Sequence, residues 1–439
     1  MKSGVFGRST KLLTMASKLA RHEVVKELKN KLVSKVEERA SQELKARIRQ
    51  AKILAENLSD LKGAAMKAGQ LLSLDSSEIL PEEVTEILSQ LQSSARSEPY
   101  EEMKKILLEE LGDHRLAELK NLSQEPLAAA SIGQVHRVTI HDKEAVLKIR
   151  YPGVVDSIDS DLKILRKVAE LFLNVSGKRV DLKELFEELS IVLHQEADYL
   201  QEAQTMARFG ELCQNIEGIT LPKPFFEYTT KKVLAMTYTP GRPILDWIKS
   251  GPSREDREWV GRRILDLYCR EFFDWGLVQT DPNYGNFKIQ TEPLQLVVLD
   301  FGATLEYDAE FRKKYVELLR SFASFDHEMI LKSSLSFGLI DPRESEEAKG
   351  HFVEFLKASV EPFLPQLQPF RFKDADYAKK ANEVGRRFTS SLKYSAPPRK
   401  LIFLHRKLGG IFNLLRRMDV SINLTPYWKK MVGEDFITG

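Results

Sequence analysis

Cysteine is scarce in this chain, because its 439 residues include only Cys213 and Cys269. Two cysteines are too few for a disulfide framework and are typical of a reducing compartment. The eight histidines are scattered without the spacing of zinc ligands. We therefore expect neither a disulfide-stapled fold nor a metal cluster.

Long apolar runs are missing as well. No stretch approaches the roughly 18 consecutive apolar residues of a membrane-spanning helix, and no internal repeat or low-complexity tract is present. The hydrophobic content of 42% is nevertheless enough for a large buried core, and the length suggests two or three lobes. Any membrane contact is therefore expected to be peripheral.

Acidic residues are absent from the first 22 positions, and basic residues gather at this end of the chain. Residues 1–52 carry 14 Lys and Arg against 5 Glu, a local net charge of +9 in a chain whose total is +2. Apolar positions recur at helical spacing from Leu12 to Val24, which predicts a basic amphipathic helix that can lie on an anionic membrane. A solvated docking helix, a frayed terminus and a short transit peptide are the alternatives.

One set of polar residues predicts phosphoryl-transfer chemistry. Asp281 and Asn286 have four residues between them, and Asp300 begins an Asp-Phe-Gly sequence. In protein-kinase-like sites such an Asp meets the attacking group, while the Asn and the second Asp hold Mg²⁺ against the phosphates. The apolar run Leu296–Leu299 predicts a short buried strand that delivers the Asp300 carboxylate. Asp-Phe-Gly alone would also fit a surface turn, but the matched upstream pair favours a metal site.

A phosphate-anchoring lysine is expected upstream on a strand. Residues 135–140 and 144–150 are two short apolar runs, and His141-Asp-Lys between them predicts a hairpin turn. Because side chains alternate along a strand, Lys148 and Val146 share one face. Lys148 is therefore predicted to point toward the nucleotide phosphates, although a lone strand lysine more often lies at a solvated edge.

An alanine-rich segment precedes this hairpin, where a kinase carries its glycine-rich phosphate loop. The residues predicted to contact nucleotide there are Ala128, Ala129, Ala130, Ser131 and Gly133. Alanine carries a Cβ atom and favours helical backbone, so this loop should be stiffer than one with three glycines. The start of an ordinary Ala-rich helix is the alternative.

These motifs together resemble the UbiB/ADCK (AarF-type) family of atypical kinases. The resemblance rests on Pro126–His136, Lys148–Gly153 and Met66–Leu72, and it runs from about residue 55 to about residue 415. The Gln279–Phe287 and Leu404–Gly410 segments are closer to the mitochondrial coenzyme Q branch than to the bacterial form.

The resemblance implies roles for two further motifs. Lys67 and Gln70 of the Lys-x-Gly-Gln motif would lie on an added helix that covers the active site and disfavours protein substrates. Glu196 of the Glu-x-Asp motif, which ends at Asp198, would pair with Lys148. By sequence alone Glu170 is a nearer rival for that pairing, but the resemblance favours Glu196, on a helix expected from Leu182 to Arg208.

The nucleotide base is expected at the linker after the strand 232–238, through backbone groups of Met236, Tyr238 and Thr239. Thr280 stands where many kinases have the arginine that reads activation-loop phosphate. Its presence argues against control by activation-loop phosphorylation.

The resemblance implies an α+β, two-lobed protein-kinase-like fold with an N-terminal helical extension packed over the active site. The expected divisions are a basic amphipathic extension at 1–50, a helical extension at 51–125, an N-lobe at 126–240 and a C-lobe at 241–439. Beyond Asp300 the chain is expected to be helical to its end, with amphipathic helices at Glu310–Phe325, Glu344–Val360, Ala375–Leu392 and Leu401–Arg416.

The leading hypothesis is a kinase-like ATPase that binds ATP or ADP with Mg²⁺ and phosphorylates little or no protein in trans. The resemblance implies support of ubiquinone or prenyl-lipid synthesis, with prenyl-lipid intermediates and coenzyme Q biosynthesis proteins as partners and no nucleic acid. The expected location is cytoplasmic and peripheral at a membrane, or the mitochondrial matrix face if the N-terminus is a transit peptide. A nucleotide-sensing pseudokinase scaffold and a conventional protein kinase are the alternatives.

Overall fold

A computed structural model of the chain describes residues 97–175, 182–392, 394 and 399–433. The predictions for Lys67, Gln70 and the amphipathic N-terminal helix lie outside the described residues. Two compact units are present. The described parts of Met1–Val138, Leu147–Gly177 and Asp181–Ala197 form the first unit, and those of Thr139–Val146 and Asp198–Gly439 form the second.

The predicted hairpin before and after residue 141 is confirmed. It consists of β2 (Gly133–Ile140) and β3 (Lys143–Arg150), joined by His141 and Asp142. Both turn residues have left-handed backbone, with φ of 48° and 57°. Positive φ at both central positions is the geometry that matches the twist of two-residue hairpins. β1 (Ala128–Ala129) pairs antiparallel with β2, and β5 (Val233–Thr237) completes the sheet in the order β1-β2-β3-β5.

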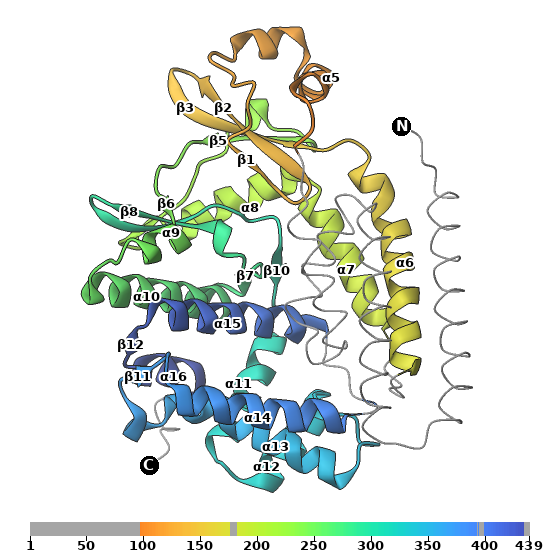
Figure 1. Ribbon diagram of the computed structural model, residues 1–439, viewed down its shortest axis with the longest axis vertical. Helices are drawn as coiled ribbons and strands as arrows, with labels where there is room; N and C mark the ends of the chain where they lie inside the picture. Colours follow the sequence, from red (N-terminus) through yellow and green to blue (C-terminus); the bar gives the residue numbers. More distant parts are fainter. Residues whose placement is uncertain (1–96, 176–181, 393, 395–398, 434–439) are drawn as a thin grey trace, which may run out of the picture. The chain divides into compact units, whose positions relative to one another are not determined.

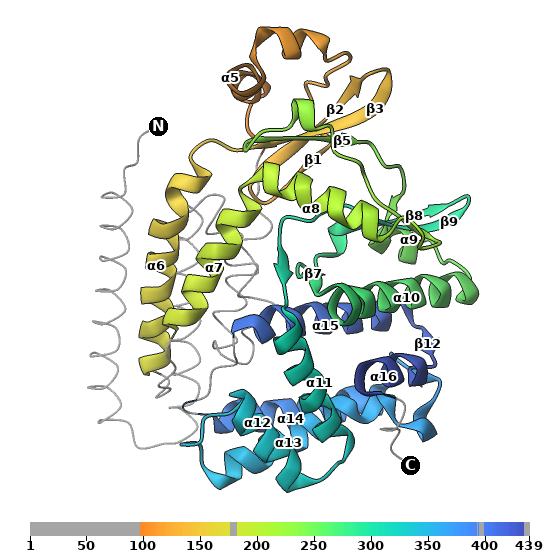
Figure 2. The same ribbon diagram turned by 180° about the vertical axis from the view of Figure 1, so that it is seen from behind.

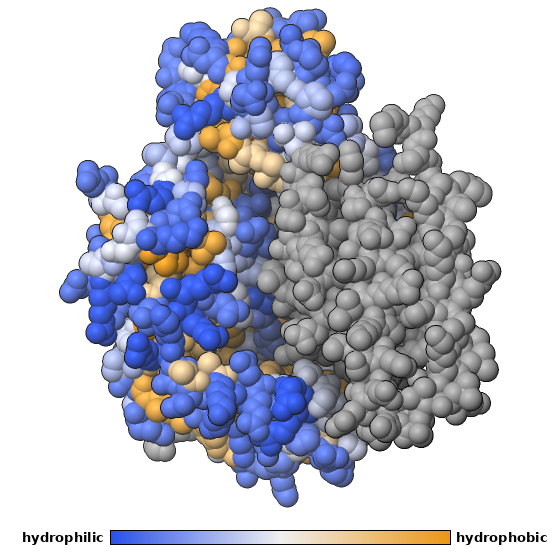
Figure 3. Space-filling model, in the orientation of Figure 1, coloured by the Kyte–Doolittle hydropathy of each residue, from blue (hydrophilic) through white to orange (hydrophobic). Residues whose placement is uncertain are grey.

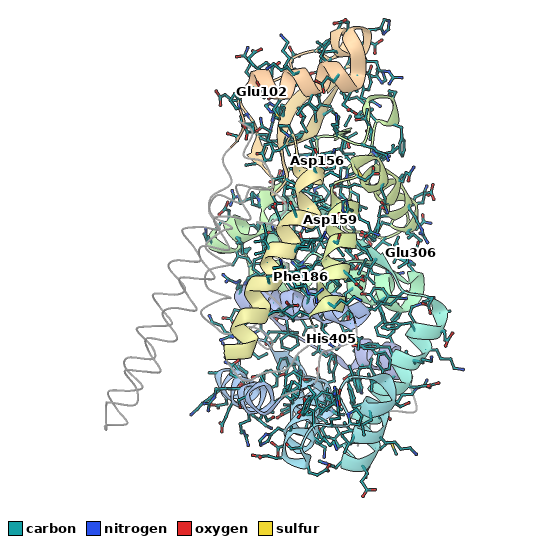
Figure 4. The ribbon with its side chains drawn as sticks, turned by 90° about the vertical axis from the view of Figure 1, so that its right-hand side faces the viewer. Glu102, Asp156, Asp159, Phe186, Glu306 and His405 are labelled. Carbon is teal, nitrogen blue, oxygen red and sulfur yellow. The ribbon has the colours of Figure 1, made fainter. Side chains whose placement is uncertain are left out.

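The described part of the first unit contains three helices. They are α5 (Tyr100–Glu118), α6 (Val154–Val175) and α7 (Lys183–Glu196). The helices α6 and α7 run side by side (Figures 1 and 2). The Ser190 hydroxyl of α7 donates a 2.7 Å hydrogen bond to Asp159 of α6, and the apolar side of α7 buries Phe186 (Figure 4).

The single helix predicted from Leu182 to Arg208 is wrong. The chain leaves helical geometry at Asp198, whose φ is −99° and ψ is 91°, and α8 begins at Tyr199 and ends at Leu212. The Asp198 carboxylate accepts hydrogen bonds from the N–H groups of Leu200 and Gln201, at 3.2 and 3.3 Å. An aspartate in this N-cap position satisfies donors that the first turn of a helix leaves unpaired, so it starts a new helix instead of continuing the old one.

A second four-stranded sheet lies in the second unit. Its order is β4 (Ile219–Thr220), β9 (Leu294–Val298), β8 (Phe287–Thr291) and β6 (Arg242–Pro243). The strand predicted before Asp300 is confirmed as β9, whose last three residues are buried. It pairs antiparallel with β8 in a register that places Phe287 opposite Val298.

Helices make up most of the second unit (Figure 1). Besides α8 they are α9 (Ile244–Lys249), α10 (Arg254–Cys269), α11 (Ala309–Ala323), α12 (His327–Phe337), α13 (Glu346–Val360), α14 (Ala375–Ser391), α15 (Arg399–Met418) and α16 (Thr425–Val432). The four helices predicted after Asp300 are confirmed as α11, α13, α14 and α15.

The expectation that the chain is helical to its end is wrong in two places. β10 (Thr304–Glu306) pairs with β7 (Leu277–Gln279), and β11 (Phe370–Arg371) pairs with β12 (Ser421–Ile422). Strands of two or three residues are too short to show the alternation that identifies a strand in a sequence.

On the face shown in Figure 3, the surface of the described residues is mainly hydrophilic. The exposed large apolar side chains of the described residues are Leu108, Leu127, Ile191, Phe226, Met329 and Leu367. Among the described helices none combines the length and the apolar character needed to cross a bilayer.

Candidate active site

The β8–β9 hairpin brings the two predicted metal ligands to one end of a sheet. Asn286 immediately precedes β8, and Asp300 follows β9 by two residues. The Leu299 N–H donates a 3.0 Å hydrogen bond to the Asn286 carbonyl, so the pairing continues one step past both strands. The Gly302 N–H donates to the Asp300 carboxylate at 3.0 Å, which orients that side chain in its turn.

Asp281 follows β7 in a segment that is buried and firmly held. The Thr280 backbone N–H and hydroxyl both donate to the Ala303 carbonyl at 2.8 Å. The Gln279 side-chain amide donates to the Asp281 carbonyl at 3.1 Å. Since Gln279 and Thr280 are at most 1% exposed, the residues that depart from the usual kinase sequence here serve to fix the loop backbone.

The carboxylate of Asp281 meets three donors. They are the Asn283 N–H at 3.3 Å, the Asn286 side-chain amide at 3.4 Å and the Arg406 guanidinium at 3.3 Å. The side chains of Asp281 and Arg406 are 4% and 1% exposed, so this is a buried ion pair. Asp281 and Asn286 are thus in direct contact.

Arg406 belongs to α15, a helix whose sequence pattern predicts no role in the site. Its neighbour Lys407 forms a second buried ion pair, with Glu271. Burial raises the pKa of Glu271 to about 7, although the charge of Lys407 lowers it. Four residues after Arg406, Gly410 lies so close to Pro282 that an added Cβ would stand 2.1 Å from the proline Cβ. One face of α15 therefore supports the Asp281 loop.

The helix itself was predicted from its amphipathic pattern, but only a family likeness could have indicated that it contacts the Asp281 loop. The Leu404–Gly410 segment was noted as similar to the coenzyme Q branch, but nothing in its local pattern connects it with Asp281, which lies 125 residues before Arg406.

Lys148 and Glu196 both lie in the first unit and are 7% and 3% exposed. Lys148 and Arg150 share one face of β3 by alternation. The Arg150 guanidinium donates to the Ala197 carbonyl, directly after Glu196, so this face is turned toward the end of α7. The pairing of Lys148 with Glu196 stays a prediction. The rival Glu170 forms a 2.6 Å ion pair with Arg166 on its own helix.

The alanine-rich segment is a loop and not the start of a helix. Ala128 and Ala129 form β1, and the Ala130 N–H closes the loop by donating to the Gly133 carbonyl at 2.8 Å. The Ser131 hydroxyl donates to a carboxylate oxygen of Glu196 at 3.4 Å. The loop is therefore joined to the end of α7 within the first unit.

The predicted hinge follows β5. The Tyr238 N–H donates to the Glu144 carbonyl at 3.0 Å, and the Thr237 N–H donates to the Lys223 carbonyl at 2.9 Å. The Lys288 ammonium lies 5.4 Å from the centre of the Tyr238 ring. A hollow of about 710 Å³ lies beyond this segment, lined by Pro240, Trp247 and Gln290 among others, and includes none of the predicted site residues.

Asp198, the last residue of the Glu-x-Asp motif, has a structural role at the start of α8, and a catalytic role for it stays a prediction. Its carboxylate caps α8 and lies 3.7 Å from the Lys231 ammonium. Within the described parts of the chain, no group of three or more His, Cys, Asp or Glu side chains is placed to hold a metal ion.

The fold is kinase-like. A solved structure of Rv3197 in complex with erythromycin, from Mycobacterium tuberculosis, superposes with a TM-score of 0.59 and covers 90% of this chain and 99% of its own, at 23% identity.

The chain belongs to the family of the ABC1 atypical kinase-like domain, whose model matches residues 90–334. The mitochondrial atypical kinase COQ8 of Saccharomyces cerevisiae is 32% identical over 386 residues, or 86% of this chain and 75% of that protein. The probable serine/threonine-protein kinase abkA of Dictyostelium discoideum is 30% identical, over 85% of this chain and 69% of that protein. The mitochondrial atypical kinase COQ8B of Rattus norvegicus is also 30% identical, over 85% and 70%.

Proposed function

We propose that this protein binds Mg-ATP and hydrolyses it, or transfers its phosphoryl group to a small acceptor, in support of ubiquinone or related prenyl-lipid synthesis. The observation that carries the proposal is the arrangement of Asp281, Asn286 and Asp300. The first two are in contact, and the second and third stand at one end of the β8–β9 hairpin.

The donor chemistry of this set fits Mg²⁺. The Asn286 amide nitrogen is turned toward Asp281, so the amide oxygen is the atom that would bind a cation. The Asp300 carboxylate, oriented by the Gly302 N–H, supplies a hard anionic ligand. Mg²⁺ commonly takes one or two protein ligands of this kind together with phosphate oxygens, and it would neutralise charge on the phosphates. A site with one carboxylate and one amide ligand is therefore compatible with the metal.

Asp281 would orient the attacking water or acceptor hydroxyl. Its loop backbone is fixed by Thr280 and Gln279, and its carboxylate is held by Arg406. Such fixed geometry favours positioning, because the reacting groups need no reorganisation at the moment of reaction. In the first unit Lys148, oriented by Glu196, would bind the α and β phosphates beside the Ala130–Gly133 loop.

Adenine would bind through the backbone after β5. The N–H groups of Thr237 and Tyr238 donate to carbonyls. We propose the backbone of Met236, Tyr238 and Thr239 as the part of the linker that contacts the base. We propose Lys67 and Gln70 as residues that cover the site, so that protein substrates are disfavoured.

The pathway is inferred from the relatives. Two of them are named as mitochondrial COQ8 kinases, and support of ubiquinone synthesis is the corresponding proposal for this chain.

One observation favours a second candidate, a nucleotide-sensing scaffold that does not hydrolyse ATP. The Asp281 carboxylate is 4% exposed and already accepts from three donors, including a guanidinium. A carboxylate stabilised in this way by hydrogen bonds and an opposite charge is a weak proton acceptor. Positioning without strong proton abstraction is sufficient for phosphoryl transfer through a loose transition state, so the ATPase remains the leading proposal.

The test is phosphate release by purified protein with Mg-ATP, with and without anionic liposomes. Asp281→Asn keeps the shape of the side chain and should reduce turnover by at least about tenfold, with nucleotide affinity retained. Nucleotide binding without any phosphate release in the wild type would support the scaffold instead. Strong labelling of a generic protein substrate would support a conventional kinase.

A further inference from the structure

Two buried polar side chains in the first unit have no role in the proposed chemistry. Gln134 and His136 lie on β2, immediately after the alanine-rich loop, and both are 0% exposed. Residues two apart on a strand share a face, so both side chains emerge on the same side of β2. Burying an amide and an imidazole is costly unless their hydrogen bonds are made, so their partners need an explanation.

The side-chain amide of Gln134 forms two hydrogen bonds with the backbone of Glu98. Its side-chain oxygen accepts from the Glu98 N–H at 2.9 Å, and its side-chain nitrogen donates to the Glu98 carbonyl at 3.3 Å. The amide thus pairs with a peptide backbone as a neighbouring strand would. The second hydrogen of the same nitrogen is directed to His136 Nε2, at 2.9 Å.

The partners of His136 determine which ring nitrogen carries the hydrogen. Nδ1 lies 2.8 Å from the Ser123 carbonyl, which can only accept, so Nδ1 carries the hydrogen and Nε2 accepts from Gln134. The Tyr100 ring lies against the imidazole, with centroids 6.0 Å apart. Both ring nitrogens are therefore hydrogen-bonded, and a continuous series of hydrogen bonds joins Glu98, Gln134, His136 and Ser123.

This series of hydrogen bonds is directly connected to the alanine-rich loop. Gln134 is the backbone partner of Ala129 in the β1–β2 pair, and the Ala130 N–H closes the loop on Gly133. The Tyr151 N–H donates to the Ile132 carbonyl at 2.9 Å on the other side of the loop. The loop that would contact phosphate thus continues directly into β2. The first two buried polar side chains of β2 contact residues 98–100, because Gln134 hydrogen-bonds to Glu98 and His136 lies against Tyr100.

We propose that Gln134 and His136 are positioning residues that hold the Ala128–Gly133 loop in its nucleotide-binding geometry by tying β2 to Glu98 and Tyr100. This proposal rests on the proposed nucleotide binding at the loop. Without the tie, the loop backbone gains freedom that nucleotide binding has to remove, so affinity falls.

The test compares Gln134→Leu and His136→Phe with Arg137→Gln, a change in an exposed side chain on the same strand. Gln134→Leu removes three hydrogen bonds at similar volume, and His136→Phe keeps a ring against Tyr100 but removes both nitrogens. One hydrogen bond contributes about 0.5–1.5 kcal/mol, so each of the two variants should weaken Mg-ATP binding by about three- to tenfold in calorimetric titration. Arg137→Gln should not.

Amide hydrogen exchange in the nucleotide-free protein supplies a readout that a purely structural role would not move. Exchange at Ala130 should accelerate in both variants, while exchange in α6 and α7 stays at the wild-type level. Unchanged Mg-ATP affinity together with unchanged exchange at Ala130 would overturn the proposal. If Gln134→Leu does not fold, His136→Phe decides. A wild-type protein that binds no Mg-ATP would refute the proposed function, and the exchange at Ala130 would still decide whether the tie positions the loop.

Discussion

Two adjacent glycines of α15 provide a matched test of how this helix supports the Asp281 loop. Gly409 and Gly410 are both helical, but a Cβ at Gly409 would meet nothing within 4 Å, whereas a Cβ at Gly410 would stand 2.1 Å from Pro282 Cβ. The substitutions Gly409→Ala and Gly410→Ala therefore add the same atom to the same helix, and only the second one pushes on the loop.

The magnitudes follow from the two environments. Replacing glycine by alanine inside a helix stabilises it by about 0.8–1 kcal/mol, and both variants gain this term. Carbon atoms in contact are about 3.5–4 Å apart, so Gly410→Ala has to move Pro282 or α15 by more than about 1 Å. Overpacking of this kind costs about 1–3 kcal/mol, so the two variants should differ in unfolding free energy by that amount.

The two glycine variants should also differ in kcat. Pro282 follows Asp281 directly, and a displacement of about 1 Å in a catalytic group can lower kcat by about 100-fold. The assays are denaturant unfolding and the rate of phosphate release at saturating Mg-ATP. Equal stability and equal kcat in the two variants would refute the conclusion that α15 sets the position of the loop.

Three further predictions concern the charged groups around this loop and α8. Arg406→Lys keeps the charge but loses the planar guanidinium, so kcat should fall by about tenfold with little change in KM for ATP; an unchanged kcat would contradict the positioning of Asp281 by Arg406. Lys407→Met leaves Glu271 buried without its cation, which should destabilise the protein by about 3–5 kcal/mol at pH 8, and the double variant with Glu271→Gln should recover most of the loss. Burial already raises the pKa of Glu271 from 4.5 to about 7. The loss of unfolding free energy in Lys407→Met should therefore be small below the unfolded pKa near 4.5 and grow as the pH rises through the folded pKa. A loss of unfolding free energy that does not change with pH would contradict this. Asp198→Ala should lower the unfolding free energy by about 1 kcal/mol and Asp198→Asn by only a few tenths, whereas loss of turnover in a fully stable Asp198→Asn would show a catalytic role instead of a cap.

Local patterns in the sequence predicted the parts of the site that depend on local structure. The apolar run before Asp300 and the alternation around Lys148 each specify a strand, and the strand determines where the next polar side chain lies. The turn predicted at His141-Asp-Lys likewise follows from two short runs close together in the sequence, and the structure narrows it to His141 and Asp142 because β3 begins at Lys143.

The features that sequence reasoning missed depend on long-range contacts or on competition between local structures. Helical periodicity continues through Asp198, so the break there becomes visible only when its carboxylate is seen to cap α8. Arg406 and Gly410 lie more than a hundred residues from the loop they contact, and no local pattern reports which face of α15 meets Asp281. The sequence around Gln134 and His136 likewise predicts only a strand, because their hydrogen-bond partners lie on other segments or are decided by side-chain geometry.

The central claim is that Asp300 holds Mg²⁺ for ATP turnover at the end of the β8–β9 hairpin. The most direct measurement is the rate of Mg-dependent phosphate release by wild-type protein and by Asp300→Asn, with unfolding midpoints measured in parallel. Loss of the carboxylate should reduce the rate by at least about 100-fold at equal stability, because the metal would lose its anionic ligand. Phosphate release that Asp300→Asn leaves unchanged would contradict the account.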